Sequence, residues 1–167
     1  MLGKRPVQLA LILITALLLQ ACGFQLRGEV QLPSSISPVH IQGLGTYHDL
    51  RIELTHLMST NAVTITDSPE GAASTLHIEK YEQNRRTLSV DSNGNAAEYE
   101  LYQGATFSMA DSDGNELVAK QTVGVIQDYI NTGTLVLGKQ QEESTLRREM
   151  QRDLAGRIVR RLQNQLR

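Results

Sequence analysis

Four histidines and one cysteine are the side chains of this sequence whose types could support nucleophilic or metal chemistry. They are His40, His48, His56, His77 and Cys22. The histidines are scattered, and His48 and His56 lie about two turns apart on the same predicted helix. No His-Glu-x-x-His motif, cysteine pair, glycine-rich phosphate loop or nucleophile elbow occurs. We therefore expect no metal site and no enzyme activity, and interpret the histidines as surface or half-buried side chains.

Asp111, Asp113 and Asn115 have the alternate spacing of the first ligands of a calcium-binding loop. The glycine of this stretch stands at loop position 4 instead of 6, and position 12 is Thr122 instead of a glutamate. Asp-Gly is also typical of tight hairpin turns. We therefore predict a turn at this point and no ion site.

The first residues have the layout of a secretory signal. A short basic start precedes a largely apolar run over 7–19, and the small residue Ala21 stands before Cys22. The apolar run is shorter than the roughly 20 residues that a membrane-spanning helix requires. We predict that residues 1–21 are a signal peptide, cut after Ala21.

Cys22 is the only cysteine, and the sequence Leu19-Gln20-Ala21-Cys22 resembles the lipobox of bacterial lipoproteins, from which Gln20 departs. The resemblance implies diacylglycerol on the Cys22 sulfur and a fatty acyl group, palmitate, on the amine that cleavage frees. We expect no cofactor besides these covalent lipids, which exceed the two signals that stable anchoring requires. Gly23 in place of an aspartate implies, again by resemblance, a lipid anchor in the outer membrane. The alternative is an ordinary signal peptide followed by a chance cysteine.

The charge balance bears on the class of partner. The whole chain has 16 Lys and Arg against 18 Asp and Glu. Loss of Lys4 and Arg5 with the signal leaves the mature chain at a formal charge of −4. Nucleic-acid binding requires a basic footprint, so we expect no nucleic-acid partner.

The first half of the mature chain predicts one helix between short strands. Residues 22–38 read as a lipidated tether, because their apolar alternation is weak and prolines and serines interrupt it. Thr46 and Asp49 have capping-box spacing and predict a helix that ends near Asn61. Short strands are expected at 39–41 and 63–65. The apolar positions at helical spacing are Tyr47, Leu50, Leu54, Leu57 and Met58.

The second half predicts three strands and a final helix. Residues 76–90, 97–109 and 117–130 are β-like, and Asp-Ser-x-Gly-Asn turns join them at 91–95 and 111–115. This arrangement is most simply an antiparallel three-stranded meander. A stripe that recurs every four residues then predicts a helix: Leu146, Met150, Leu154, Ile158, Leu162 and Leu166.

Together these elements predict an α+β fold. Two helices should pack on one face of a small mixed β-sheet that contains the antiparallel meander. We expect a single domain over 39–167, following the signal peptide and the tether.

Two groups of basic residues could bind an anion. Arg85 and Arg86 lie in the middle of a predicted strand, where they either bind a ligand or protect a sheet edge with charge. The arginines of the last helix form either a face for acidic lipid or polyanion, or a solvated face that Glu149 and Asp153 balance. The residues alone leave both pairs of alternatives open.

Several motifs resemble the LPS-assembly lipoprotein LptE family, and they follow one another in order along nearly the whole mature chain. They are Cys22-Gly23-Phe24-x-Leu26-Arg27-Gly28, Ala97-Glu98-Tyr99-Glu100-Leu101, Leu137-Gly138-Lys139 with Glu142-Glu143, then Leu146, Glu149-Met150, Asp153-Leu154-Ala155 and Arg160-Arg161-Leu162. The resemblance implies two helices on a small sheet, as the pattern itself predicts.

The resemblance further implies a structural role in lipopolysaccharide transport. Such proteins plug the lumen of the outer-membrane β-barrel LptD, assist its assembly and bind lipopolysaccharide (LPS) during its delivery to the outer leaflet. By this resemblance Lys139 is a candidate LPS contact. The hairpin tip at Ser92 lacks the cation that the family would place there, and Arg85 and Arg86 are candidate substitutes on chemical grounds.

A second function class stays open beside this one. A periplasmic-facing lipoprotein could instead capture a small ligand or a peptide at a sheet edge. A tight apolar pocket between helix and sheet would favour it. An enzyme, the third class, has no support in the sequence.

Overall fold

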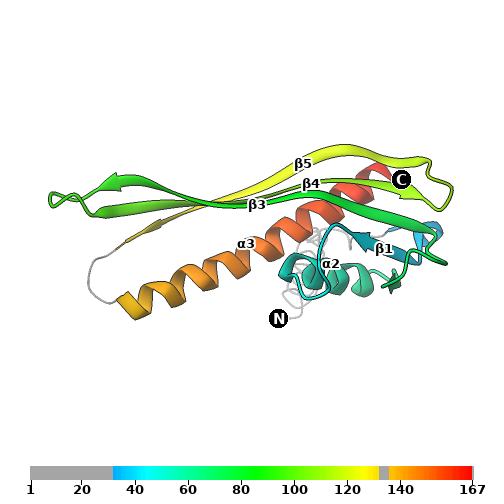
Figure 1. Cartoon of the computed structure of the whole chain (residues 1–167), viewed down its shortest axis with the longest axis horizontal. Coiled ribbons are helices and arrows are strands. Elements are labelled where there is room, and N and C mark those ends of the chain that lie inside the picture. Colours follow the sequence, from blue (N-terminus) through cyan, green and yellow to red (C-terminus); the bar gives the residue numbers. More distant parts are fainter. Residues whose placement is uncertain (1–31, 132–135, 167) are drawn as a thin grey trace, which may run out of the picture.

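The computed structural model describes residues 32–131 and 136–166, and the side chains of all of these except 136–140. The elements run in the order η1 (Ser34–Ile36), β1 (Val39–Gln42), α2 (Asp49–Thr60), β2 (Ile65–Thr66), β3 (Ser74–Val90), β4 (Ala96–Asp111), β5 (Glu116–Ile130) and α3 (Val136–Gln165). Within these residues, the helices α2 and α3 lie on one side of a five-stranded sheet (Figure 1). The predicted α+β architecture is confirmed. No helix among the described residues has both the length and the apolarity to cross a membrane.

The sheet is mixed, with the strand order β2-β1-β3-β4-β5. β1 is parallel to both β2 and β3, whereas β3, β4 and β5 form the predicted antiparallel meander. Pairing between β1 and β3 ends at Gln42 and His77. The long remainder of β3 therefore has only β4 as a strand partner among the described residues.

The two meander turns use the same local chemistry. In the first turn, the Asp91 carboxylate accepts hydrogen bonds from the backbone N–H groups of Asn93 and Asn95, at 2.8 and 2.9 Å. Gly94 takes a φ of +81°, and Gly114 takes +85° in the second turn. The residues before these glycines, Asn93 and Asp113, do not take a positive φ. In each turn, the side chain of the first aspartate accepts the backbone hydrogen bonds that stabilise the remaining residues.

The start of α2 differs from the predicted one. The backbone N–H of His48 donates to the Gly45 carbonyl at 3.0 Å, so a turn occupies the residues that were expected to begin the helix. His48 is the N-cap in place of Thr46, and its Nδ1 accepts from the Leu50 N–H at 3.2 Å. Tyr47, expected on the apolar face, is 91% exposed. The buried stripe of Leu50, Leu54 and Met58 is confirmed.

The packed domain includes the last part of the range that was expected to be a tether. Leu32 and Ile36 are buried in the core. The Ser74 hydroxyl donates to the Ile36 carbonyl at 2.6 Å, and the Ser37 hydroxyl accepts from the Thr64 N–H. The structure therefore extends the folded domain back to Leu32, ahead of the boundary expected at residue 39. The second short strand also shifts, to Ile65–Thr66.

The core lies between α3 and the inner face of the meander. Met150, Leu154, Ile158 and Leu162 of α3 are buried, and Phe107 of β4 is fully buried opposite them. This confirms the stripe read from the sequence. The meander is long, so its 91–95 turn and its 111–115 turn lie at opposite ends of the molecule (Figure 1).

Gly43, directly after β1, allows a close approach between backbones. Its φ is +92°, and a Cβ at this position would overlap the carbonyl oxygen of Ile78 on β3. Gly43→Ala should therefore lower the free energy of unfolding by about 3 kcal/mol. Gly45→Ala is the matched control, because a Cβ there meets no atom within 4 Å and its effect should stay within about 0.5 kcal/mol. Urea denaturation measures both, and equal losses would contradict this account.

Candidate functional site

The residues singled out from the sequence fall into three groups. Ala21 and Cys22, the expected cleavage and lipidation positions, lie outside the described residues. Lys139 belongs to the first turns of α3, but its side chain also lies outside the described part. Arg85 and Arg86 are described, and their surroundings test whether they form one site.

Arg85 points from the inner face of β3 toward α3. Its Nη1 donates to Oε2 of Glu143 at 2.8 Å. Its guanidinium carbon lies 4.6 Å from the centre of the Tyr99 ring, a cation–π distance. Arg85 therefore joins the far part of the meander to the start of the last helix.

Glu143 is the centre of a polar cluster, which consists of Arg85, Tyr99, Tyr129, Glu143 and Arg147. The Tyr129 hydroxyl donates to Glu143 at 2.7 Å, and Nε of Arg147 donates to it at 2.8 Å. Burial alone raises the pKa of Glu143, but the hydrogen bonds from Tyr129, Arg147 and Arg85 outweigh it and lower this pKa to about 2. Burial and the carboxylate of Glu143 raise the pKa of Tyr129 to about 12.

Arg86 lies on the other face of the sheet. It pairs with Glu100, its cross-strand neighbour on β4, at 2.7 Å. Because successive side chains of a strand alternate between faces, Arg85 and Arg86 do not converge on one ligand. Both lie on the part of β3 that β1 does not cover, which favours the interpretation as a charged sheet edge.

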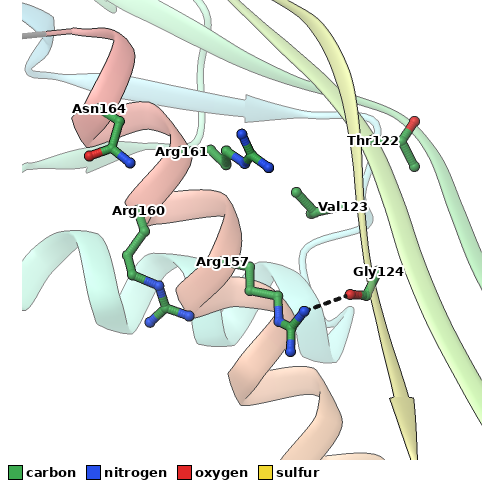
Figure 2. A pocket seen from close by; sticks show the side chains of 7 residues that line it. All are labelled: Thr122, Val123, Gly124, Arg157, Arg160, Arg161 and Asn164. Atoms are coloured by element: carbon green, nitrogen blue, oxygen red, sulfur yellow. Dashed lines mark hydrogen bonds between the residues drawn. The ribbon is translucent and has the colours of Figure 1, made fainter.

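The arginines of α3 form a more open surface near the C-terminal end of the helix. Arg157, Arg160 and Arg161 line a hollow together with Asn164 and residues 122–124 of β5 (Figure 2). Asp153 pairs with Arg157 at 2.9 Å and with Arg160 at 3.6 Å. Asp153, expected from the sequence to balance these arginines, therefore pairs with Arg157 and Arg160 but not with Arg161. We call these four α3 residues with 122–124 the arginine groove.

The histidines have local roles where they can be assigned. His48 caps α2 and contacts the Tyr81 ring edge-on, with ring centres 4.8 Å apart. Nδ1 of His40 lies 3.2 Å from the carbonyl oxygen of Thr66. In the described ranges, no three metal-ligating side chains come together. Asp111, the first residue of the calcium-like spacing, bonds instead to Asp113 and Asn115 of its own turn.

The Glu143 cluster predicts a specific pH dependence. Glu143→Gln removes the charge that holds the cluster and should lower the free energy of unfolding near pH 7 by about 1–2 kcal/mol. The folded-state pKa lies below the unfolded value, so this contribution is present above about pH 5 and is lost as the pH falls toward 2. Denaturation across this range should show the two proteins converge in acid.

The neighbouring residue provides the control for this experiment. Glu142 is exposed, so Glu142→Gln removes the same charge without removing a cluster contact. Its stability should match the parent at every pH. A loss equal to that of Glu143→Gln would show that helix charge, and not the cluster, is responsible.

Comparison with known proteins gives the family. The sequence pattern of the LptE family, described as lipopolysaccharide-assembly, matches residues 36–162. The chain is 30% identical over 156 residues to the LPS-assembly lipoprotein LptE of Yersinia pestis, covering 92% of this chain and 74% of the relative. It is 28% identical over 155 residues to the protein of that name from Photorhabdus laumondii, covering 92% and 84% of the two chains.

Solved structures agree in fold. A lipoprotein B from Nitrosomonas europaea superposes with a TM-score of 0.66 at 26% identity, covering 83% of this chain and 88% of the other. A minor lipoprotein from Acinetobacter baumannii has the same TM-score of 0.66 at 23% identity, covering 79% and 94%. This family is not one of enzymes, as expected from the missing catalytic motifs. The chain, with its two helices on a mixed sheet and its match from residue 36 to residue 162, belongs to the LptE family of lipopolysaccharide-assembly lipoproteins.

Proposed function

We propose that this protein is an outer-membrane lipoprotein, anchored by lipid on Cys22 at the periplasmic face, that plugs an LptD-type β-barrel and binds LPS during its delivery. The family match over residues 36–162 carries this proposal. Relatives named LPS-assembly lipoprotein LptE align over nearly the whole chain. The signal, the single cysteine and its neighbours support the lipid anchor.

The shape and polarity of the domain suit a plug. The inner face of the meander is covered by helices, so the outer face remains for a partner. That outer face carries polar side chains along β4, at Glu98, Glu100, Thr106 and Ser108. The lumen of large outer-membrane barrels is polar, and a polar sheet face matches such a wall better than an apolar one.

The position of Cys22 limits where the domain can lie. The packed domain begins at or before Leu32, so few residues separate it from the proposed anchor. Even fully extended, this segment spans on the order of 35 Å. The domain must therefore lie close to the membrane surface, where the periplasmic opening of a barrel would be.

The alternative, a binding module for a small ligand or peptide, receives less support. The space between α3 and the sheet is filled by core side chains such as Phe107, Leu154 and Ile158. An enclosed apolar pocket at this place would have favoured that class. Depletion of the protein separates the two classes, because only the plug function requires a loss of LPS at the cell surface.

Purification of the native complex tests the barrel partner. The full-length lipoprotein, extracted from outer membranes in mild detergent, should carry a large β-barrel protein in about equal amount. Mass spectrometry identifies the partner, and heat-modifiable mobility on gels identifies a barrel. Recovery of the lipoprotein alone from intact outer membranes would contradict the plug function.

Lys139 tests the LPS contact. Lys139→Glu should weaken binding of purified LPS by about tenfold or more, because a phosphate would then face a carboxylate. The barrel should still co-purify. Lys80→Glu, the same charge change on an exposed lysine of β3, should leave LPS binding unchanged. Equal binding by the parent and Lys139→Glu would remove Lys139 from the site.

A further inference from the structure

The arginine groove is a hollow of about 550 Å³ between the C-terminal half of α3 and β5. Figure 2 shows Arg157 and Arg161 extending from the helix toward the strand, with Arg160 beside Arg157. The C-terminal half of α3, which supplies four of the lining residues, lies toward the end of the molecule that carries the C-terminus, far from the start of the helix (Figure 1). From Lys139 to Arg161 the helix rises by on the order of 33 Å, so these residues belong to separate sites.

The groove has more positive charge than its surroundings neutralise. Three guanidinium groups line it, and no carboxylate is among the lining residues. Asp153, just outside, is shared by Arg157 and Arg160. Within the described part of the chain, Arg161 has neither a hydrogen-bond acceptor nor an ion-pair partner. Helical spacing alone brings residues 157, 160 and 161 to one face, but the positive charge around this hollow exceeds what Asp153 neutralises.

Two further features position Arg157 and Arg160. Arg157 donates to the backbone carbonyl of Gly124 on β5 at 3.1 Å, which fixes it across the groove. Arg160 folds over Gly156, where a Cβ would come within 3.3 Å of its Nη1. Glycine inside a helix costs about 1 kcal/mol relative to alanine. At this position it gives Arg160 the room to lie against the helix.

These features match the chemistry of a phosphate group. The planar guanidinium donates two parallel hydrogen bonds to phosphate oxygens, which makes arginine the preferred residue for this ligand. The amide of Asn164 adds a neutral donor. Further along β5, Ile126 and Ile130 are 60% and 65% exposed on the strand face that Gly124 shares, which is the face turned away from α3. Ile126 lies about 7 Å along the strand from Gly124, so an acyl chain whose headgroup occupies the groove would reach it by crossing the open edge of β5.

We infer that the arginine groove binds a phosphate group of an amphiphile and that LPS is its ligand in the cell. The inference rests on the proposed function for the identity of the amphiphile, but not for the phosphate chemistry. It adds a second LPS contact, at the opposite end of α3 from Lys139. Arg160 and Arg161 contact the phosphate, while Arg157 and Gly156 position the groove.

The test uses the full-length lipoprotein in detergent and the double substitution Arg160→Gln with Arg161→Gln. The matched control is Arg148→Gln with Arg152→Gln, which removes two charges from the same helix outside the groove. The probes are intact LPS, enzymatically dephosphorylated LPS and inorganic pyrophosphate. Thermal unfolding of each variant checks that the fold is retained.

The parent should bind intact LPS at least about tenfold more tightly than the dephosphorylated form, and the groove variant should lose the part of that preference that the Lys139 contact does not supply. The control variant should keep it. Pyrophosphate should bind the parent and shift the amide NMR signal of Asn164, but should do neither in the groove variant. A groove variant whose preference for phosphorylated LPS equals that of the parent overturns the inference.

Pyrophosphate binding distinguishes failure of the phosphate site from failure of the proposed LPS function. If the parent binds pyrophosphate in the groove but not LPS, the phosphate site stands and the proposed LPS function fails. If the parent binds LPS without regard to phosphate and ignores pyrophosphate, the proposed function stands and the groove inference fails. Binding of neither probe overturns both.

Discussion

Burial of one helical stripe against one sheet face is the interaction on which the rest of this molecule depends. Leu154, Ile158 and Leu162 are buried against the inner face of the meander. Full burial of one such side chain stabilises the fold by about 1.5–3 kcal/mol. With few aromatic residues in the chain, no large side chain could replace this aliphatic layer. The helix covers the central part of the inner face, so the outer face, the strand edges and the ends are the surfaces that remain for recognition.

Beyond this layer, the meander is held to α3 by polar contacts. Arg85 and Tyr129 reach the helix through Glu143 where apolar cover is thin. An acidic group held by two arginines and a phenol stays ionised across ordinary pH, so the connection is constant under physiological conditions. The two ends of the molecule thus differ in kind: one rests on aliphatic packing, the other on a charged cluster.

The features with a short period could be predicted from the sequence. Alternation and turn residues gave the three strands with small errors at their ends, and the four-residue stripe gave α3. The predicted N-cap of α2 was wrong because a turn from Gly45 to His48 competes with the capping box. Residue spacing alone does not show which of these two local structures is more stable. The contact of Arg85 with Glu143 joins positions that no local pattern links. Alternation alone, in contrast, could have shown that Arg85 and Arg86 face opposite ways.

The contact between Arg157 and the Gly124 carbonyl also bears on self-association of the chain. β5 is one of the two edge strands of the sheet, and an edge strand offers unpaired backbone groups to any extended chain. A guanidinium on one of its carbonyls occupies an acceptor that a second copy would need for edge-to-edge pairing. The contact therefore makes edge-to-edge pairing of two copies along β5 less favourable while the strand has no other partner.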